Sequence, residues 1–237
     1  MTARTAIVTG GGKGIGCALA LRLASIGYDL VVAARNQSEI AEVARRCRQL
    51  GRRAIAVTTD ICEEASVSKM FANSIKEFGT IDLLVNNAGI GIFKPLIETS
   101  LAEWEQVIKT NLTGAFLCAR YAFRLMKEQG GGSIVNVSSV VGIKGYPNQG
   151  AYTASKHGLV GLSKVLAEEG RPFNIRVNVI CPGGVATEMV RQSRPDLNPD
   201  EIIQPEDVAD LLEYLVKMPP RVSVDLVHLR RFNSNAF

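Results

Sequence analysis

Short apolar runs alternate with longer amphipathic stretches along most of the chain. The runs are rich in Val, Ile, Leu and Ala and are bounded by glycine or polar residues, which is typical of buried strands. We expect strands at 5–8, 29–34, 54–57, 81–85, 133–137 and 175–180, and a seventh strand could run from 222 to 229.

The stretches between these runs predict helices, because their apolar residues recur with helical spacing. Helices are expected at 18–24, 40–47 and 67–78, from about 100 to 128, from about 151 to 169, and from Pro205 onward. Ser100 followed by Glu103 forms a capping-box pattern, and Asn36 followed by Glu39 resembles one.

Strands that alternate with helices indicate an α/β fold, a doubly wound parallel sheet of about seven strands with helices on both faces. A chain of 237 residues is expected to form it as a single domain, 1–237. Ligands of such sheets bind beyond the carboxyl ends of the strands. Polar and glycine-rich segments gather at those ends, at 9–16, 35, 60, 86–89, 139 and 182–187, which predicts one site built from the whole chain.

Composition narrows the class of protein. Hydrophobic residues make up 46% and charged residues 21% of the chain, as in ordinary soluble globular proteins. The net charge is only +4, and the densest basic stretch, 45–53, falls at a predicted helix end, which favours a solvated helix terminus over nucleic-acid binding. No apolar run approaches the roughly 18 residues of a membrane span, and no signal peptide opens the chain.

The cysteines and histidines argue against a disulfide-bonded or metal-binding protein. The five cysteines are scattered without C-x-x-C spacing, which favours reduced thiols in a cytoplasmic setting over disulfides or zinc. Two isolated histidines are too few for a metal cluster, so no metal is expected. The G-x-S-x-G elbow of α/β-hydrolases is absent, and Lys13 is followed by Gly14 where a P-loop needs Ser or Thr.

The first predicted strand runs into a glycine-rich turn, Thr9 to Gly16, that a helix follows. In this context the backbone can approach a phosphate closely, and the helix N-terminus supplies free N–H groups and a positive dipole. The usual dinucleotide spacing, G-x-G-x-x-G, fails in every register. From these residues alone, the segment could be a nucleotide-binding turn or a simple tight turn.

Tyr152 and Lys156 stand four residues apart in a predicted helix and therefore share a face. A phenol has a pKa of about 10, which a neighbouring ammonium lowers toward neutral pH. Ser139 ends the fifth strand near the same crevice, where its hydroxyl could bind an oxygen that gains charge. Taken alone, the pair could be an exposed helical pair and Ser139 a strand cap. Asn111, a poor helix former inside a predicted helix, could equally be a structural hydrogen-bonding residue or a site residue.

Together these residues resemble the short-chain dehydrogenases/reductases (SDR), a Rossmann-fold family, over about residues 4–218. The family's cofactor turn has the spacing of Thr9-Gly10-x-x-x-Gly14-Ile15-Gly16, and its catalytic tetrad matches Asn111, Ser139, Tyr152 and Lys156. The resemblance assigns cofactor binding to Thr9, Gly10, Gly12, Lys13, Gly14, Ile15, Gly16, Arg35, Asp60, Ile61, Asn87, Ala88, Gly89, Tyr152, Lys156, Pro182, Gly183, Val185 and Thr187.

The resemblance implies hydride transfer between nicotinamide C4 and a carbonyl or alcohol carbon. Tyr152 would be the general acid in reduction and the general base in oxidation. Lys156 would lower the pKa of Tyr152 and bind the nicotinamide ribose, and Ser139 would hold the substrate oxygen. Asn111 would position a water that links Lys156 to solvent.

The expected cofactor is NADP(H). An acidic residue after the second strand would bind the ribose 2′-hydroxyl of NAD, but Ala34 stands there and Arg35 follows. Lys13 adds a second cation on the same side, and in this family such a pair resembles an NADP site.

The substrate is poorly specified by the sequence. Candidate wall residues are mostly apolar or small, which suits a ketone, a 3-hydroxy acid or a similar alcohol. The chain also resembles 3-oxoacyl-[acyl-carrier-protein] reductases, but the carrier is a doubtful partner because 130–133, before the fifth strand, has no charge. A catalytically silent NADP-sensing protein is a remote alternative. The resemblance implies a homodimer or homotetramer whose two long helices pack across a two-fold axis.

Overall fold

The fold is built on one parallel sheet of seven strands in the order β3-β2-β1-β4-β5-β6-β7. The structure, a computed structural model, describes residues 3–234. The strands are β1 (Thr5–Thr9), β2 (Asp29–Ala34), β3 (Ala54–Thr58), β4 (Leu83–Asn86), β5 (Gly132–Val137), β6 (Ile175–Pro182) and β7 (Leu226–Leu229). The strand order reverses between β1 and β4, so the fold is doubly wound, as predicted.

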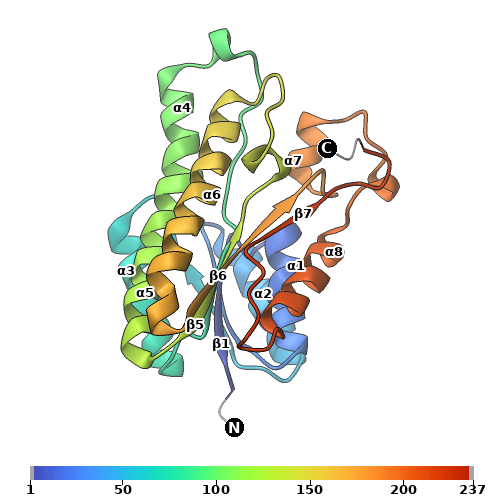
Figure 1. Ribbon diagram of the computed structural model, residues 1–237. Helices are drawn as coiled ribbons and strands as arrows, with labels where there is room; N and C mark the ends of the chain where they lie inside the picture. The colour runs from blue at the N-terminus through green and yellow to red at the C-terminus, as the bar shows by residue number, and fades with distance from the viewer. Residues whose placement is uncertain (1–2, 235–237) are drawn as a thin grey trace.

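Helices cover both faces of the sheet (Figure 1). They are α1 (Gly14–Ser25), α2 (Gln37–Gln49), α3 (Glu64–Phe78), α4 (Leu101–Ile108), α5 (Ala115–Gln129), α6 (Gly150–Gly170), α7 (Glu188–Ser193) and α8 (Pro205–Val216). One apolar core lies under α1, α2 and α8, where Leu19, Ile40 and Leu212 are fully buried. A second core lies under α3, α5 and α6 and contains Met70 and Met126. Within residues 3–234, none of the helices has both the length and the apolar character needed to cross a membrane.

The helix predicted from about 100 to 128 is interrupted. Ser100 and Glu103 form the expected capping box, but a π-helical segment, Lys109–Gly114, separates α4 from α5. The side chain of Asn111, in the middle of this segment, hydrogen-bonds both backbone groups of Ile90. A contact with a distant loop therefore accompanies the change of helical pitch, and the helical spacing of the sequence did not reveal it.

Two strands are shorter than predicted. β4 begins at Leu83 rather than 81, and just before it the carboxylate of Asp82 accepts a hydrogen bond from the backbone N–H of Thr5 at 2.7 Å. β7 covers only Leu226–Leu229, since residues 219–222 form a turn in which the N–H of Val222 donates to the carbonyl of Pro219.

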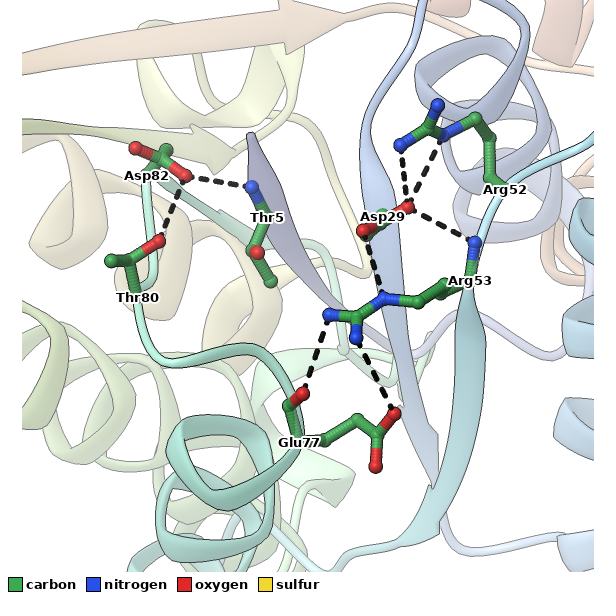
Figure 2. Close-up of polar contacts among 7 residues, drawn as sticks. All are labelled: Thr5, Asp29, Arg52, Arg53, Glu77, Thr80 and Asp82. Atoms are coloured by element: carbon green, nitrogen blue, oxygen red, sulfur yellow. Dashed lines mark hydrogen bonds and ion pairs between the residues drawn. The ribbon is translucent and has the colours of Figure 1, made fainter. Parts of the chain in front are cut away.

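A polar network ties together the amino ends of the strands (Figure 2). Asp29, at the start of β2, is almost fully buried and accepts hydrogen bonds from both Arg52 and Arg53, the shortest at 2.7 Å. Arg53 continues to Glu77, at the end of α3. These arginines belong to the basic stretch 45–53, so part of that stretch stabilises the sheet edge opposite the predicted site.

Candidate active site

A cavity of about 710 Å³ opens at the carboxyl edge of the sheet, where the strand order reverses. Its walls come from the turn after β1, the ends of β2 to β5, and the N-terminal parts of α6 and α7. Of the residues predicted to bind cofactor, the cavity is lined by Gly10, Gly12, Lys13, Gly14, Ile15, Gly16, Arg35, Asp60, Ile61, Asn87, Ala88, Gly89, Tyr152, Lys156 and Thr187.

The glycine turn forms the floor of this cavity. Gly14 has φ +52°, a conformation that favours glycine, and α1 begins at this residue, so its first N–H groups have no helical partner. A Cβ on Gly16 would lie 2.1 Å from the carbonyl oxygen of Gly10. The turn therefore keeps the backbone bare beside a helix N-terminus, which fits a pyrophosphate.

Thr9 supports the turn from below and is buried behind the lining. Its hydroxyl accepts hydrogen bonds from the N–H groups of Asn87 and Ala88 at 3.1 and 3.2 Å. The Asn87 amide in turn donates to the carbonyl oxygens of Thr9 and Gly10, both at 3.1 Å. These bonds fix the turn after β1 to the motif after β4.

Cations gather at one end of the cavity. Arg35, exposed just beyond β2, and Lys13, next to Gly14, both line it. The Lys13 ammonium donates to Glu188 at 2.9 Å, and this hydrogen bond raises the pKa of Lys13. Ala34, at the end of β2, leaves room at the position where NAD enzymes carry an acid.

Lys156 lies at the other end of the cavity, on α6. Its ammonium donates to the carbonyl oxygen of Val137 at 2.9 Å, and the side chain is almost fully buried. Burial lowers the pKa of Lys156 to about 8. The ammonium lies 5.8 Å from the centroid of the Tyr152 ring, one helical turn earlier.

Tyr152 faces the same end of the cavity. Burial raises the pKa of its phenol above the ordinary value, and a hydrogen bond with Ser139 partly offsets that rise. The lowering that the sequence predicts from Lys156 is not among the causes of this shift. Phe93 meets the Tyr152 ring edge-on, with ring centroids 5.6 Å apart, so the phenol is set in an apolar wall.

Ser139 sits where β5 gives way to the short helix Val140–Gly142 and caps that helix by accepting a hydrogen bond from the N–H of Val141 at 3.3 Å. The neighbouring Ser138 donates to the carbonyl of Lys156 at 3.1 Å. The end of β5 is therefore fastened to α6, and Ser139 is placed beside Tyr152.

Asn111 is buried next to Lys156 rather than in the cavity lining. Its amide nitrogen donates to the carbonyl of Ile90 at 2.9 Å and to Ser155 at 3.0 Å, while its oxygen accepts from the N–H of Ile90 at 2.8 Å. A Cβ on Gly89 would contact both the Asn111 oxygen, at 3.2 Å, and the Lys156 nitrogen, at 3.5 Å. Asn111 thus ties the central-strand motif to α6.

At the end of β6 and after it, one predicted cofactor-binding residue lines the cavity and the others lie behind the lining. Thr187 lines the cavity and caps α7 by accepting from the N–H of Val190 at 3.4 Å. Pro182, Gly183 and Val185 lie behind it, where the N–H of Gly183 donates to Leu229 at 2.8 Å and Val185 is buried beside Ile203. They set the path of the segment.

The sequence did not single out several charged or thiol side chains that line the cavity, namely Glu39, Cys62, Glu188 and Arg191. Glu39 lies in α2 and faces Gly12, whereas Glu188 and Arg191 project from α7. Glu39 was expected only as part of the capping pattern after Asn36, and no local motif places these side chains in the site, because their position depends on how the elements dock.

Comparison with known proteins agrees with this geometry. The model of the short chain dehydrogenase family matches residues 4–198. A 3-oxoacyl-[acyl-carrier-protein] reductase of Synechocystis sp. is 37% identical over 229 residues, covering 92% of this chain and 91% of the relative. A cis-4-hydroxycyclohexanecarboxylate dehydrogenase of Sinomonas cyclohexanicum is 38% identical over 225 residues, covering 90% of this chain and 88% of the relative. The solved structure of an alcohol dehydrogenase from the archaeon Thermococcus sibiricus, complexed with 5-hydroxy-NADP, superposes with a TM-score of 0.91 at 29% identity and covers 99% of both chains.

Proposed function

The chain belongs to the short-chain dehydrogenase family of oxidoreductases, and on that basis we propose that it transfers hydride between NADP(H) and a ketone or secondary alcohol. One observation carries the proposal. A single cavity has Tyr152 and Lys156, with Ser139 beside them, at one end and Arg35 with Lys13 at the other. A dinucleotide bound along it would bring its nicotinamide to the tyrosine and its adenosine ribose to the two cations.

The chain's own residues would handle the proton and the orientation of the substrate. Bound NADPH would supply the hydride in reduction, and NADP⁺ would accept it in oxidation. In reduction the Tyr152 phenol would donate its proton to the carbonyl oxygen, and in oxidation its phenolate would remove one. The Ser139 hydroxyl would hold that oxygen, and the buried Lys156 ammonium would bind the ribose and favour the phenolate.

The cations favour NADP(H) over NAD(H). A 2′-phosphate carries two negative charges, and Arg35 can meet it with a planar fork of donors while Lys13 adds a point charge. The Thermococcus sibiricus relative was solved with an NADP derivative, which supports the same preference.

The walls near Tyr152 favour an apolar ring or chain next to the reacting carbonyl. Phe93 packs against Tyr152, and Ile90 and Met189 line the same cavity. A relative that is a dehydrogenase of a hydroxylated cyclohexane carboxylate supports an alicyclic substrate. The Synechocystis relative supports reduction of 3-oxoacyl groups as the second candidate.

We further propose that the whole chain is one domain that assembles as a homodimer or homotetramer in the cytoplasm. Large apolar side chains are exposed on the helices that would pack across the two-fold axis: Leu101, Trp104, Phe116 and Val165. The five cysteines are all free thiols, which fits a reducing compartment.

Titration with the two reduced cofactors tests the proposed preference. The protein should bind NADPH at least 10-fold more tightly than NADH, and Arg35→Ala should remove most of that difference while NADH affinity changes little. Turnover of NADPH should follow with cyclohexanones or with acetoacetyl thioesters, which separates the two substrate candidates. Equal affinity for both cofactors would refute the preference.

A further inference from the structure

Lys13 and Glu188 join the two walls at the adenosine end of the cavity. Lys13 directly precedes α1, and Glu188 is the first residue of α7. Their side chains meet at 2.9 Å, and both residues line the cavity. The cation expected to read a 2′-phosphate therefore already has an anionic partner.

The two segments also touch through apolar atoms. A Cβ on Gly14 would lie 3.2 Å from the methyl carbon of Thr187, so the N-terminus of α7 packs directly on the glycine turn. The ion pair is the polar part of this contact. A ligand that draws Lys13 toward the ribose therefore competes with Glu188 for the ammonium.

The charges around the pair offer Glu188 a second partner. Arg191 follows Glu188 by three residues on α7, lines the cavity, and makes no ion pair within 4.0 Å among residues 3–234. Both Lys13 and Arg191 lower the pKa of Glu188, the lysine more strongly. If Lys13 leaves Glu188, the carboxylate can therefore pair with Arg191, because side chains three residues apart on a helix are neighbours.

We propose that Glu188 is a cofactor-specificity residue: it holds Lys13 in the absence of a 2′-phosphate, competes with that phosphate for the lysine, and passes to Arg191 when NADP(H) binds. This proposal rests on the NADP(H) dependence proposed above. Because the phosphate carries more charge than one carboxylate, it wins the competition at a cost in affinity. Its binding also releases the N-terminal end of α7 from the turn.

The double-mutant cycle of Lys13 and Glu188 tests this competition. Dissociation constants for NADPH and NADH would be measured by nicotinamide fluorescence for the wild type, Glu188→Gln, Lys13→Met and the double variant. Glu188→Gln should tighten NADPH binding about 2- to 5-fold and change NADH binding less than about 1.5-fold, as expected for an exposed ion pair. With Lys13→Met present, the same change should have no effect on NADPH.

A control variant separates the effect of breaking the Lys13–Glu188 pair from the effect of changing the net charge. Glu42 forms a similarly exposed ion pair with Arg45 on α2, outside the cavity lining. Glu42→Gln removes the same charge and should leave both dissociation constants unchanged.

Amide hydrogen exchange gives a second readout. The amides of Arg191 and Arg194 donate hydrogen bonds to the carbonyl groups of Thr187 and Val190. Binding of 2′-AMP, but not of 5′-AMP, should speed exchange at these two amides.

The outcomes distinguish this inference from the proposed function. If the wild type prefers NADPH but Glu188→Gln leaves or weakens NADPH binding, the role of Glu188 is refuted and the NADP(H) preference stands. If the wild type binds both cofactors equally and Glu188→Gln creates a preference for NADPH, the role of Glu188 stands and the preference is refuted. Equal binding in both proteins refutes both.

Discussion

The ammonium of Lys156 donates a hydrogen bond to the carbonyl oxygen of Val137, at 2.9 Å, from a side chain that is almost fully buried. Burial disfavours the charge and lowers the pKa of Lys156 to about 8. The unfolded chain, with a lysine pKa of about 10.4, therefore binds more protons between these two values. In that pH window the stability contributed by this group rises with pH.

Lys156→Met removes this pH dependence. The free energy of unfolding of the wild type, minus that of the variant, should rise by about 1 kcal/mol between pH 8 and pH 9, because the wild type sheds its buried charge. Urea unfolding at the two pH values measures the difference. A constant or falling difference would mean that the lysine keeps its charge at no cost.

Gly16→Ala should weaken cofactor binding. The added Cβ would lie 2.1 Å from the carbonyl oxygen of Gly10 and 2.5 Å from the Asn87 amide, so the turn has to move. We expect affinity for NADPH to fall more than about 10-fold, since phosphate binding depends on close backbone approach. Gly145→Ala is the matched control, because its Cβ meets no atom within 4 Å, and it should bind NADPH like the wild type.

Asp29→Asn should destabilise the fold without changing the site. The buried carboxylate holds Arg52 and Arg53 at the edge opposite the cavity (Figure 2). Its loss should cost about 2 kcal/mol of unfolding free energy, less than a fully buried pair because both guanidinium groups reach solvent. Thermal unfolding measures the loss, while the Michaelis constant for NADPH should stay unchanged. A variant with wild-type stability would show that the network is dispensable.

Ser139→Ala should slow turnover by about 100- to 1,000-fold, the usual effect of removing one donor to a developing oxyanion. The variant also loses the hydrogen bond that lowers the pKa of Tyr152. In the proposed mechanism alcohol oxidation needs the Tyr152 phenolate, so the rising limb of the pH–rate profile for oxidation should move to higher pH. An unshifted pH profile together with normal turnover would remove Ser139 from the mechanism.

Much of the fold could be predicted from the local pattern of apolar and polar residues. The bounds of β2 match the predicted 29–34, because a buried parallel strand is a continuous apolar run ended by polar residues. The glycine turn and the spacing of Tyr152 and Lys156 are equally local, and both segments line the cavity.

The rest depends on contacts between distant parts of the chain. The π-helical segment accompanies hydrogen bonds from Asn111 to Ile90, and Glu188 reaches Lys13 only once α7 has docked on the turn. The raised pKa of Tyr152 has the same origin, since burial by other elements, rather than its helical neighbour, dominates. Helical periodicity carries no information on such contacts.

The most direct test of the account is the single-turnover rate of NADPH oxidation by Tyr152→Phe, with the ketone that the wild type reduces fastest. The substitution removes only the phenol oxygen, so NADPH should bind within about 2-fold of the wild type while the rate falls at least 1,000-fold, the upper range for losing a general acid. A rate close to that of the wild type would contradict the assignment of Tyr152 as the proton donor.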